Sequence, residues 1–474
     1  MGYRYKKSRR VAGSANPWVE GLTDGYRWGV GKKDRDIGYT FISKTKGKFY
    51  GYRSWGWSDD ELDMWNEAIA SIERVCDLKF VDRGIDNSKN VELWFYSVGG
   101  KKDELGFAFT PGSDLPNEGL VAVGWKAYMN SNRKFTSSIK PGSYYWITYI
   151  HELGHAVGLK HPHDRGLAGQ GRFPGLRPNS NELRDAGEFG QNAQPFTMMT
   201  YVDKWARNGL VASAELDYGF LKTPGALDIA TLQHLYGLNR NTATEDDVYE
   251  LPTENEEGTG WVAIWDAGGW DCIDGSKSKD RTVIDLRNAT LALDLHAGGY
   301  VSQVKGVYGG FTIAHDWDGK NLGTAEGLCV IEEAKGGSAN DVLIGNHVAN
   351  RLIGGAGADR LTGGLGGDEF VIDLAGPFGR KYSDRITDFK SEDGDSLRLI
   401  SAESGLPEVM KISTALSRKA VRALDQSDHE LIYNQRNGYL YFNQNGEKSG
   451  WGEGGVFAIL KGGPDLSIGE ISLV

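Results

Sequence analysis

Cysteine is scarce in this chain of 474 residues. Three cysteines, Cys76, Cys272 and Cys329, allow at most one disulfide, so a disulfide scaffold is excluded. No apolar run reaches about 18 residues, which excludes a transmembrane helix. The N-terminus is basic but leads into no apolar core, so it is no ordinary secretory signal. If the protein is exported, it needs another route.

Basic residues are fewer than acidic ones, 53 against 64, which gives a net charge of −11. This balance argues against nucleic acid as the main partner. It suits cation binding, or simply solubility. Glycine, by contrast, is abundant: its 66 residues are nearly twice the usual share of about 7%. Much of it falls in the C-terminal half, which indicates turn-dense β structure. The length suffices for two or three domains.

Residues 144–161, YYWITYIHELGHAVGLKH, follow the pattern H-E-x-x-H-x-x-G-x-x-H. His151 and His155 are four residues apart, so on a helix they project from one face about 6 Å apart along its axis. This arrangement suits two imidazoles on one tetrahedral zinc ion. His161 could join them only if the helix stops, and Gly158 can end it without a Cβ penalty.

Glu152 lies one residue off the ligand face and acts in this motif as general base on the zinc-bound water. Three histidines leave the fourth zinc position for that water, whose pKa falls to about 7 in catalytic sites. The alternative is a helix with satisfied or exposed histidines. It requires a chance match to the full motif, which is rare for this composition. We therefore expect one catalytic zinc ion.

The N-terminal half combines short strand patterns with helix patterns. Ser58 and Glu61 form a capping box ahead of an apolar stripe at helical spacing, which predicts a helix. A second helix is predicted over residues 226–237, ending at a glycine cap. Strands are predicted at residues 37–43, 80–82, 91–98, 106–112 and 119–125. With the motif helix, this mixture predicts an α+β domain.

From residue 246 the chain consists of short strand patterns between Gly, Asp and Asn turns, and it contains a nine-residue repeat. The repeat begins at Gly336, Gly345, Gly354 and Gly363. Its sixth positions hold Asp341, Asn350, Asp359 and Asp368. Its eighth positions hold Leu343, Leu352, Leu361 and Phe370. This is the nonapeptide G-G-x-G-x-D-x-U-x of a calcium-loaded parallel β-roll.

The repeat has a physical reason. Paired glycines permit a tight turn, and aspartate supplies oxygen ligands for a hard cation. A glycine-rich linker, the alternative, explains neither the period nor the apolar column. Asn350 carries no charge, and Ala339 and Val348 replace the fourth-position glycine. The first two turns are therefore expected to hold calcium more weakly.

With both motifs, the chain resembles the serralysin family: secreted bacterial zinc metalloproteases of the metzincin clan with an RTX β-roll. The resemblance runs from about Asn16 to Val474. It implies an α+β metzincin catalytic domain, a twisted sheet plus the active-site helix, at residues 17–245. An all-β parallel β-roll domain with a C-terminal secretion signal would follow at residues 246–474. Residues 1–16 are expected to be a short propeptide or a disordered N-terminus.

The resemblance also implies roles outside the zinc motif. Met199 resembles the Met-turn residue, a hydrophobic base beneath the zinc. Tyr201, in F-T-M-M-T-Y, matches the tyrosine that ligates zinc in the resting enzyme and stabilises the oxyanion when substrate binds. Residues 106–112 resemble the substrate-aligning edge strand, where a peptide would pair by β-augmentation with Ala108 facing the cleft. Without the resemblance, Met199 would be an ordinary core methionine and Tyr201 a loop aromatic.

Several structural calcium ions are implied in the same way. An interdomain site is expected in W-D-A-G-G-W-D, from the carboxylates of Asp266 and Asp271 and the carbonyls of Gly268 and Gly269. Arg240 belongs to the other side of that site, although residues 241–244 depart from the family's glycine-containing loop. The remaining expected calcium residues lie in or around the repeats: Glu332, Gly337, Asp341, Asp359, Asp368, Asp384 and Asp388.

Together these features predict an extracellular zinc-dependent endopeptidase that acts on protein or peptide substrates and is folded by calcium. The tail at residues 470–474 resembles the signal for one-step export by type I secretion machinery. The resemblance further implies a monomer and a proteinaceous inhibitor as a partner. The alternative from another class is a calcium-folded adhesion or binding protein with an inactive protease domain. An assay for zinc-dependent, chelator-sensitive cleavage separates the two.

Overall fold

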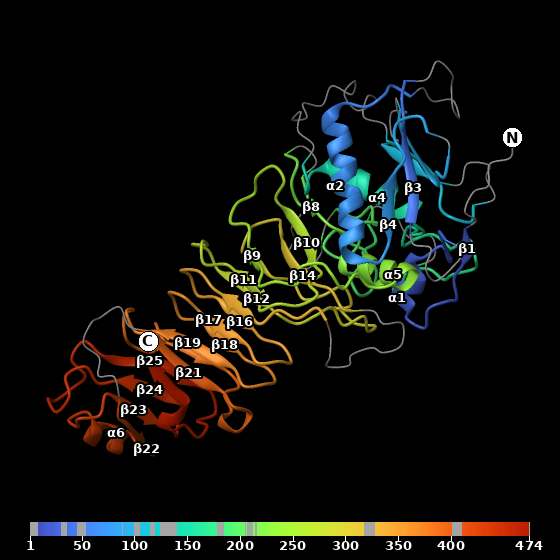
Figure 1. Ribbon diagram of the computed structural model, residues 1–474. Helices are drawn as coiled ribbons and strands as arrows, with labels where there is room; N and C mark the ends of the chain where they lie inside the picture. Colours follow the sequence, from blue (N-terminus) through green and yellow to red (C-terminus); the bar gives the residue numbers. More distant parts are fainter. Residues whose placement is uncertain are drawn as a thin grey trace.

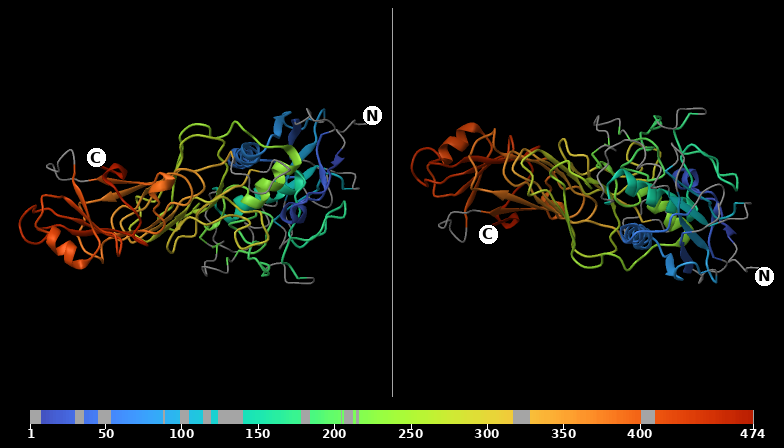
Figure 2. Two further views of the ribbon diagram at one scale, coloured as in Figure 1. Left: turned by 90° about the horizontal axis from the view of Figure 1, so that it is seen from below. Right: turned by 90° about the horizontal axis from the view of Figure 1, so that it is seen from above.

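The computed structural model describes residues 8–29, 36–44, 54–87, 89–98, 105–113, 119–123, 140–177, 184–203, 205, 212–213, 216–316, 328–400 and 410–473. The molecule is elongated, with most of the helices at one end and stacked short strands at the other (Figure 1). Figure 2 shows the two chain termini in these opposite parts. Among the described residues, no helix combines the length and the apolarity that a membrane span requires.

The N-terminal part contains a five-stranded sheet in the order β4-β3-β5-β7-β6. Its strands are β3 (Asp36–Ile42), β4 (Lys79–Asp82), β5 (Leu93–Ser97), β6 (Gly106–Ala108) and β7 (Leu120–Val123). All pairs are parallel except β6, which runs antiparallel to β7 and forms one edge. The predicted strand at 106–112 ends early, at Ala108, because a turn begins at Pro111. Residues 124 and 125 of the fifth predicted strand lie outside the described residues.

The predicted helices are present. Helix α2 (Asp59–Val75) begins at the capping box of Ser58 and Glu61, as the sequence indicates. Helix α4 (Tyr144–Ala156) packs against α2, β6 and β7, with the rings of Trp65 and Tyr149 4.6 Å apart. Helix α5 (Ala226–Tyr236) ends at Gly237, whose φ of +90° fits a glycine cap. The motif helix therefore lies directly against the sheet edge.

The N-terminal segment is folded from residue 8. Strand β1 (Arg9–Arg10) pairs with β2 (Tyr26–Arg27), and the Asn16 side chain caps α1 (Pro17–Leu22). The expectation of a disordered terminus over residues 1–16 is therefore wrong for residues 8–16, because they pair and cap within the first domain. Residues 1–7 lie outside the described residues. The propeptide alternative stays a prediction.

Two sheets of mostly parallel strands form the C-terminal part. The first has the order β26-β21-β19-β17-β15-β11-β9, and all its pairs are parallel. Its strands are β9 (Val248–Glu250), β11 (Cys272–Asp274), β15 (Glu333–Lys335), β17 (Arg351–Ile353), β19 (Glu369–Asp373), β21 (Ser396–Ile400) and β26 (Ile471–Leu473). The second has the order β13-β12-β16-β18-β20-β25-β24-β23-β22. Its strands are β12 (Thr282–Asp285), β13 (Gln303–Val304), β16 (Val342–Ile344), β18 (Arg360–Thr362), β20 (Asp384–Ile386), β22 (Ile412–Ala415), β23 (Leu431–Asn434), β24 (Tyr439–Phe442) and β25 (Gly455–Leu460).

The nine-residue repeat sets the register of these sheets. Leu343 pairs with Leu361 in the second sheet, and Leu352 pairs with Phe370 in the first. Successive repeats therefore alternate between the sheets, and two repeats complete one turn. All four eighth-position side chains are 0% exposed, which makes them the core column between the sheets. This arrangement is consistent with the predicted β-roll.

The junction and the C-terminal end differ from the expected division. A three-stranded sheet joins β8 (Phe220–Leu221) to β10 (Gly260–Ile264) and β14 (Gly310–Ile313), so the expected boundary after residue 245 separates strands of one sheet. The C-terminal part also contains helix α6 (Arg418–Leu424) and two 3₁₀ turns, η1 (Ser391–Asp393) and η2 (Ile468–Glu470). The all-β expectation does not hold at α6, where Ser417 caps a run of good helix formers.

Candidate metal centre

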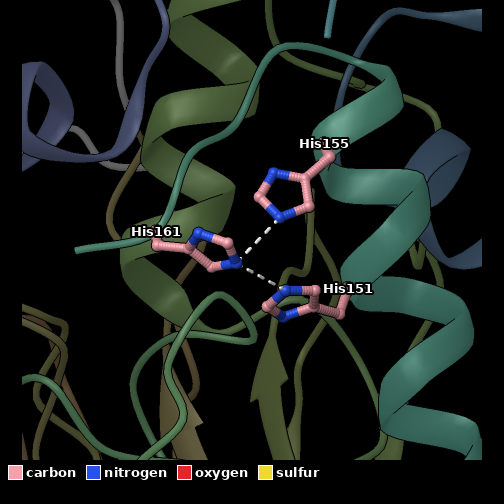
Figure 3. A group of neighbouring side chains, drawn as sticks. All are labelled: His151, His155 and His161. Atoms are coloured by element: carbon pink, nitrogen blue, oxygen red, sulfur yellow. Dashed lines mark hydrogen bonds between the residues drawn. The ribbon is translucent and has the colours of Figure 1, made fainter. Parts of the chain in front are cut away.

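The three motif histidines converge. His151 and His155 project from one face of α4, and His161 reaches them from the following loop (Figure 3). The Nε2 atom of His161 lies 3.1 Å from that of His151 and 3.0 Å from that of His155. Histidine nitrogens bound at about 2.0–2.1 Å to one tetrahedral zinc ion are separated by only slightly more than these two Nε2–Nε2 distances. The three nitrogens therefore fit one zinc-sized ion.

The other ring nitrogen of each histidine has a partner. Nδ1 of His151 bonds the carbonyl of Met198 at 2.8 Å, and Nδ1 of His155 bonds the carbonyl of Leu159 at 2.9 Å. Nδ1 of His161 bonds the carboxylate of Asp164 at 2.7 Å. These acceptors hold a proton on Nδ1, which leaves each Nε2 lone pair to a metal.

Burial keeps the two helix histidines neutral. Burial, together with the nearby His161, lowers the pKa of His151 to about 3. Burial likewise lowers the pKa of His155 well below 6.5. A metal ligand must be deprotonated, so both side chains are in the required state at neutral pH.

The end of α4 brings His161 into place. Gly158 has a φ of +105°, and a Cβ there would lie 2.5 Å from the carbonyl oxygen of Tyr26. Beyond the glycine, Leu159 bridges to Thr23, and the N–H of Lys160 donates to the carbonyl of Leu22. The N-terminal segment thus fixes the loop that carries His161, as the predicted role of the glycine requires.

Glu152 lies between α4 and the edge strand. Its side chain is 6% exposed. A Cβ at Gly106, the first residue of β6, would lie 2.8 Å from both Cγ and Oε1 of Glu152. The carboxylate therefore sits against the strand expected to align substrate. Ala108, at the other end of β6, is half-buried and pairs with Val121.

Tyr201 and Met199 flank the histidines. The hydroxyl of Tyr201 lies 2.7 Å from Nε2 of His161, close enough to share a metal ion with it. Met199 is 0% exposed, and its sulfur would lie 2.8 Å from a Cβ at Gly154 of α4. The structure thus places the Tyr201 hydroxyl against His161 and the Met199 sulfur against α4; their roles at a zinc ion stay predictions.

A second group of possible metal ligands lies between the two parts. One carboxylate oxygen each from Asp247, Asp266 and Asp271 lie within 4.8 Å of one another. Glu332 accepts a hydrogen bond from the Asp271 N–H at 2.9 Å. Burial raises the pKa of Asp271 to about 7, and the charges of Asp266 and Glu332 add to this. Oδ2 of Asp271 is buried without a hydrogen bond among the described residues. Such a crowded set of oxygens suits a cation.

Gly268 and Gly269 form the turn between these carboxylates, with φ values of +141° and +144°. A Cβ at Gly269 would lie 2.2 Å from the carbonyl oxygen of Glu245. Arg240 is exposed, and in the described part of the chain no hydrogen bond or ion pair joins its side chain to the carboxylates. Asp247 was not predicted; it lies in a run of acidic residues with no spacing to single it out.

The repeat aspartates form a ladder. Each carboxylate accepts a backbone N–H from the turn before it. Thr282 donates to Oδ1 of Asp341, and Asp341 donates to Oδ1 of Asp359, both at 2.7 Å. Asp359 in turn donates to Oδ1 of Asp384 at 2.8 Å. The opposite edge has the same hydrogen-bond pattern. The Asn350 N–H donates to the Asp368 carboxylate, and the Asp368 N–H donates to the Asp395 carboxylate. Gly337 donates to Asp341, and Gly363 and Gly364 donate to Asp388. Asp395 was missed, although it precedes Leu397 by two residues, as Asp341 precedes Leu343.

The ladder leaves acceptor capacity unused. Oδ2 of Asp359 is buried and makes no hydrogen bond to any described residue. Burial raises its pKa to about 8, and the charge of Asp384 adds to this. Burial also raises the pKa of Asp368 and of Asp384 to about 7. No basic residue in the described ranges forms an ion pair with these carboxylates, and a hard cation with oxygen ligands could supply the counter-charge.

In this fold, a cluster of three histidines that could hold a metal ion lies beside a sheet edge, and a repeat-built, parallel β region follows it. Residues 226–448 match the family model described as Peptidase M10 serralysin C terminal. The chain is 30% identical over 345 residues to the metalloprotease AprA of Pseudomonas entomophila, covering 69% of this chain and 63% of that protein.

Two further relatives agree. The metallopeptidase AprA of Pseudomonas marginalis is 28% identical over 347 residues, which cover 69% of this chain and 64% of that protein. Serralysin of Photorhabdus laumondii is 28% identical over 350 residues, which cover 69% of this chain and 62% of that protein. The chain spans slightly under two thirds of the length of these relatives. These similarities support the serralysin family for this chain.

Proposed function

We propose that this protein is an extracellular zinc endopeptidase that hydrolyses peptide bonds in proteins and is folded by calcium. The observation that carries the proposal is the convergence of three histidine Nε2 atoms, together with Glu152, on the same helix as His151 and His155, packed against strand β6. The catalytic domain is assigned to residues 17–245 and the calcium-binding β-roll to residues 246–474. Two relatives are named as a metallopeptidase and a metalloprotease, which supports the proposed protease activity.

His151, His155 and His161 hold the zinc ion in this proposal. Zinc at that place supplies a Lewis acid that polarises the scissile carbonyl and makes water a stronger acid. Glu152 accepts the proton of the attacking water and later delivers it to the leaving amine. The Tyr201 hydroxyl donates a hydrogen bond to the developing oxyanion. Strand β6 aligns the substrate backbone, with Ala108 facing the cleft.

Calcium binds two regions in this proposal. The first is the cluster of Asp266, Asp271 and Glu332, joined by Asp247. The second is the aspartate ladder of the roll. The buried oxygens of Asp271 and Asp359 that make no hydrogen bond to a described residue support both assignments. Calcium scarcity inside the cell would leave the roll unfolded for export through a type I machine, and external calcium would fold it.

The test is Glu152→Gln in the full chain, assayed on casein with zinc and calcium present. Removing the general base is expected to lower kcat by about 10²–10⁴-fold. Bound zinc, measured by elemental analysis, stays at one per chain because the histidines are unchanged. Glu256→Gln, an exposed position, is the matched control and keeps wild-type activity. Near-wild-type hydrolysis by a zinc-loaded Glu152→Gln variant would falsify the mechanism.

The alternative is a calcium-folded adhesion or binding protein with an inactive catalytic domain. It predicts no zinc-dependent, chelator-sensitive cleavage by the wild-type protein. The complete set of His151, Glu152, His155 and His161, each with an ordered partner or a packed position, favours the enzyme. A monomeric secreted protein with a proteinaceous inhibitor is part of the same proposal.

A further inference from the structure

The loop that follows His161 carries an excess of positive charge in an acidic protein. Residues 162–177 contain three arginines, Arg165, Arg172 and Arg177, and one carboxylate, Asp164, whereas the whole chain has a net charge of −11. All three arginines are exposed. We refer to residues 162–177 as the arginine loop.

The charges of the arginine loop are not neutralised by the described residues. Its one carboxylate, Asp164, is engaged by His161 at 2.7 Å. Among the described residues, no carboxylate forms an ion pair with Arg165, Arg172 or Arg177. Other arginines of the chain do have such pairs: Arg74 with Glu67, Arg287 with Asp285, Arg351 with Glu369, and Arg398 with Glu369. Within the described part of the chain, the three guanidinium groups are therefore exposed and form no ion pair.

The arginine loop is held in place. The Phe173 side chain is 2% exposed and packs edge-on against Trp18, with ring centres 4.8 Å apart. The Phe173 N–H donates to the carbonyl of Pro162 at 3.1 Å. The buried Gln170 accepts the N–H of Ala168 through its side chain and the N–H of Gly166 through its carbonyl. The arginines thus project from an anchored backbone.

This loop borders the substrate path of the proposed protease. It follows directly after His161, and the Lys160 side chain holds it by donating to the carbonyl of Asp164 at 2.9 Å. The Asp24 carboxylate accepts hydrogen bonds from the Thr110 side chain and from the Leu167 backbone. Because Thr110 follows β6, Asp24 joins the loop to the end of the edge strand. A peptide paired along β6 therefore passes the loop on one side of the histidines.

Resting on the proposed function, we propose that the arginine loop selects peptides with acidic residues on one side of the cleaved bond. Guanidinium groups pair with carboxylates in a planar, often bidentate geometry. Exposed pairs are individually weak, so each arginine is expected to contribute about two- to fivefold in kcat/KM. Uncompensated positive charge beside the cleft also steers acidic chains toward it.

The test uses three quenched-fluorescence peptides that differ only in carrying glutamate, glutamine or lysine within a few residues of the cleaved bond. Each is made in two forms, with the variable residue on either side of that bond. The full-length, zinc- and calcium-loaded protein is expected to prefer glutamate over glutamine by about tenfold, on one side only. Added salt at about 0.5 M should remove most of this preference, because it screens exposed charges.

The decisive variant is Arg165→Glu with Arg172→Glu. It is expected to lose the glutamate preference and to favour lysine, with each rate taken relative to the same variant's rate on the glutamine peptide. The matched control is Arg436→Glu, an exposed arginine in the turn between β23 and β24, remote from α4 (Figure 1). It should leave the preference unchanged. Should the double variant fail on the glutamine peptide, the single variants Arg165→Gln and Arg172→Gln carry the same comparison.

The outcomes separate the two proposals. If the wild-type protein cleaves none of the peptides or casein, the proposed function fails. If it cleaves all peptides at similar rates, or if charge reversal at Arg165 and Arg172 leaves the preference intact, the selection by the arginine loop is overturned while the protease stands. A preference that appears equally on both sides of the bond also overturns it.

Discussion

Asp228 on α5 accepts a hydrogen bond from the backbone N–H of Met198 at 2.6 Å, while the carbonyl of Met198 accepts one from His151 at 2.8 Å. The same carboxylate accepts the Thr197 hydroxyl at 2.6 Å and the Gly225 N–H at 2.8 Å. Asp228 is 0% exposed. One buried carboxylate, on helix α5, thus fixes the segment that orients His151, a proposed zinc ligand on helix α4.

Asp228→Ala should weaken zinc binding, although Asp228 is not one of the proposed zinc ligands. Three donors lose their acceptor inside the core, so the free energy of unfolding is expected to fall by about 3 kcal/mol or more. Zinc affinity, measured by competition with a chromophoric chelator, should fall about tenfold because the Met198 carbonyl is no longer held. The control is Asp63→Ala, an exposed aspartate of α2. Unchanged zinc affinity together with a lower Tm would limit Asp228 to a purely structural role.

The same carboxyl group should impose a pH dependence on stability. Burial raises the pKa of Asp228 from 3.8 to about 7, although Thr197, Met198 and Gly225 donate to it. Folding therefore takes up a proton between these two values. The stability from the protonated carboxyl is fully present below the unfolded-state pKa and is lost as the pH rises through about 7.

Asp228→Asn cannot titrate, so its Tm should fall less than that of the wild type between about pH 5 and about pH 8. The measurement is thermal unfolding in excess calcium and zinc. Asp63→Asn, which changes an exposed aspartate, should follow the wild-type profile. Parallel profiles for the wild type and Asp228→Asn would show that Asp228 is already charged across this range.

The sequence predicted the features that depend on local geometry. Helical spacing places His151 and His155 on one face, and the need for a left-handed residue identifies Gly158, which has a φ of +105°. The nine-residue period likewise identifies the core column and the aspartates of the ladder, because every repeat adds the same tight glycine turn and the same short strand. In both cases the information lies within a few residues of each position.

Features that depend on distant segments were missed. Asp228 reads as a polar residue near the start of a helix, and only the folded chain brings it beneath Met198. Asp247 lies among other acidic residues, and only the arrival of residues 266–271 makes it a possible ligand. The pairing of β8 with β10 similarly joins segments that the composition separates into two domains. No local spacing signals such contacts.

Tyr201→Phe tests the role proposed for the tyrosine. The change removes the hydroxyl that lies 2.7 Å from Nε2 of His161 but leaves the three histidines intact. Loss of one oxyanion donor is expected to lower kcat by about 10²–10³-fold with little change in KM. Zinc content should remain at one per chain. If KM rose instead and kcat did not change, Tyr201 would bind substrate rather than stabilise the transition state.

Asn350 makes one turn of the ladder different from the others. Its side-chain amide donates to the carbonyl of Glu332 at 3.3 Å and to Oδ1 of Asn346 at 3.2 Å. Its backbone N–H donates to Asp368 at 2.8 Å. The side chain in this turn is therefore hydrogen-bonded within the protein, whereas Oδ2 of Asp359 is buried without a hydrogen bond to a described residue. We expect the Asn350 turn to need calcium least.

Asn350→Asp should convert this turn to a calcium-dependent one. Without calcium, the new carboxylate loses two donated hydrogen bonds, faces Oδ1 of Asn346 and adds charge near Asp368. The calcium-free protein is then expected to lose about 1–3 kcal/mol of stability relative to the wild type. With millimolar calcium the carboxylate gains a cation, so the rise in Tm on adding calcium should exceed that of the wild type.

Thermal unfolding in calcium-depleted and calcium-containing buffer measures both the loss of stability without calcium and the rise in Tm on adding calcium. Asn437→Asp is the matched control, because the Asn437 side chain is exposed and only accepts a hydrogen bond, from the Tyr439 N–H at 3.2 Å. An aspartate keeps that bond, so the control should show the wild-type rise in Tm. An equal rise for Asn350→Asp would mean that the amide at this position does not replace calcium. The calcium requirement would then lie elsewhere in the ladder.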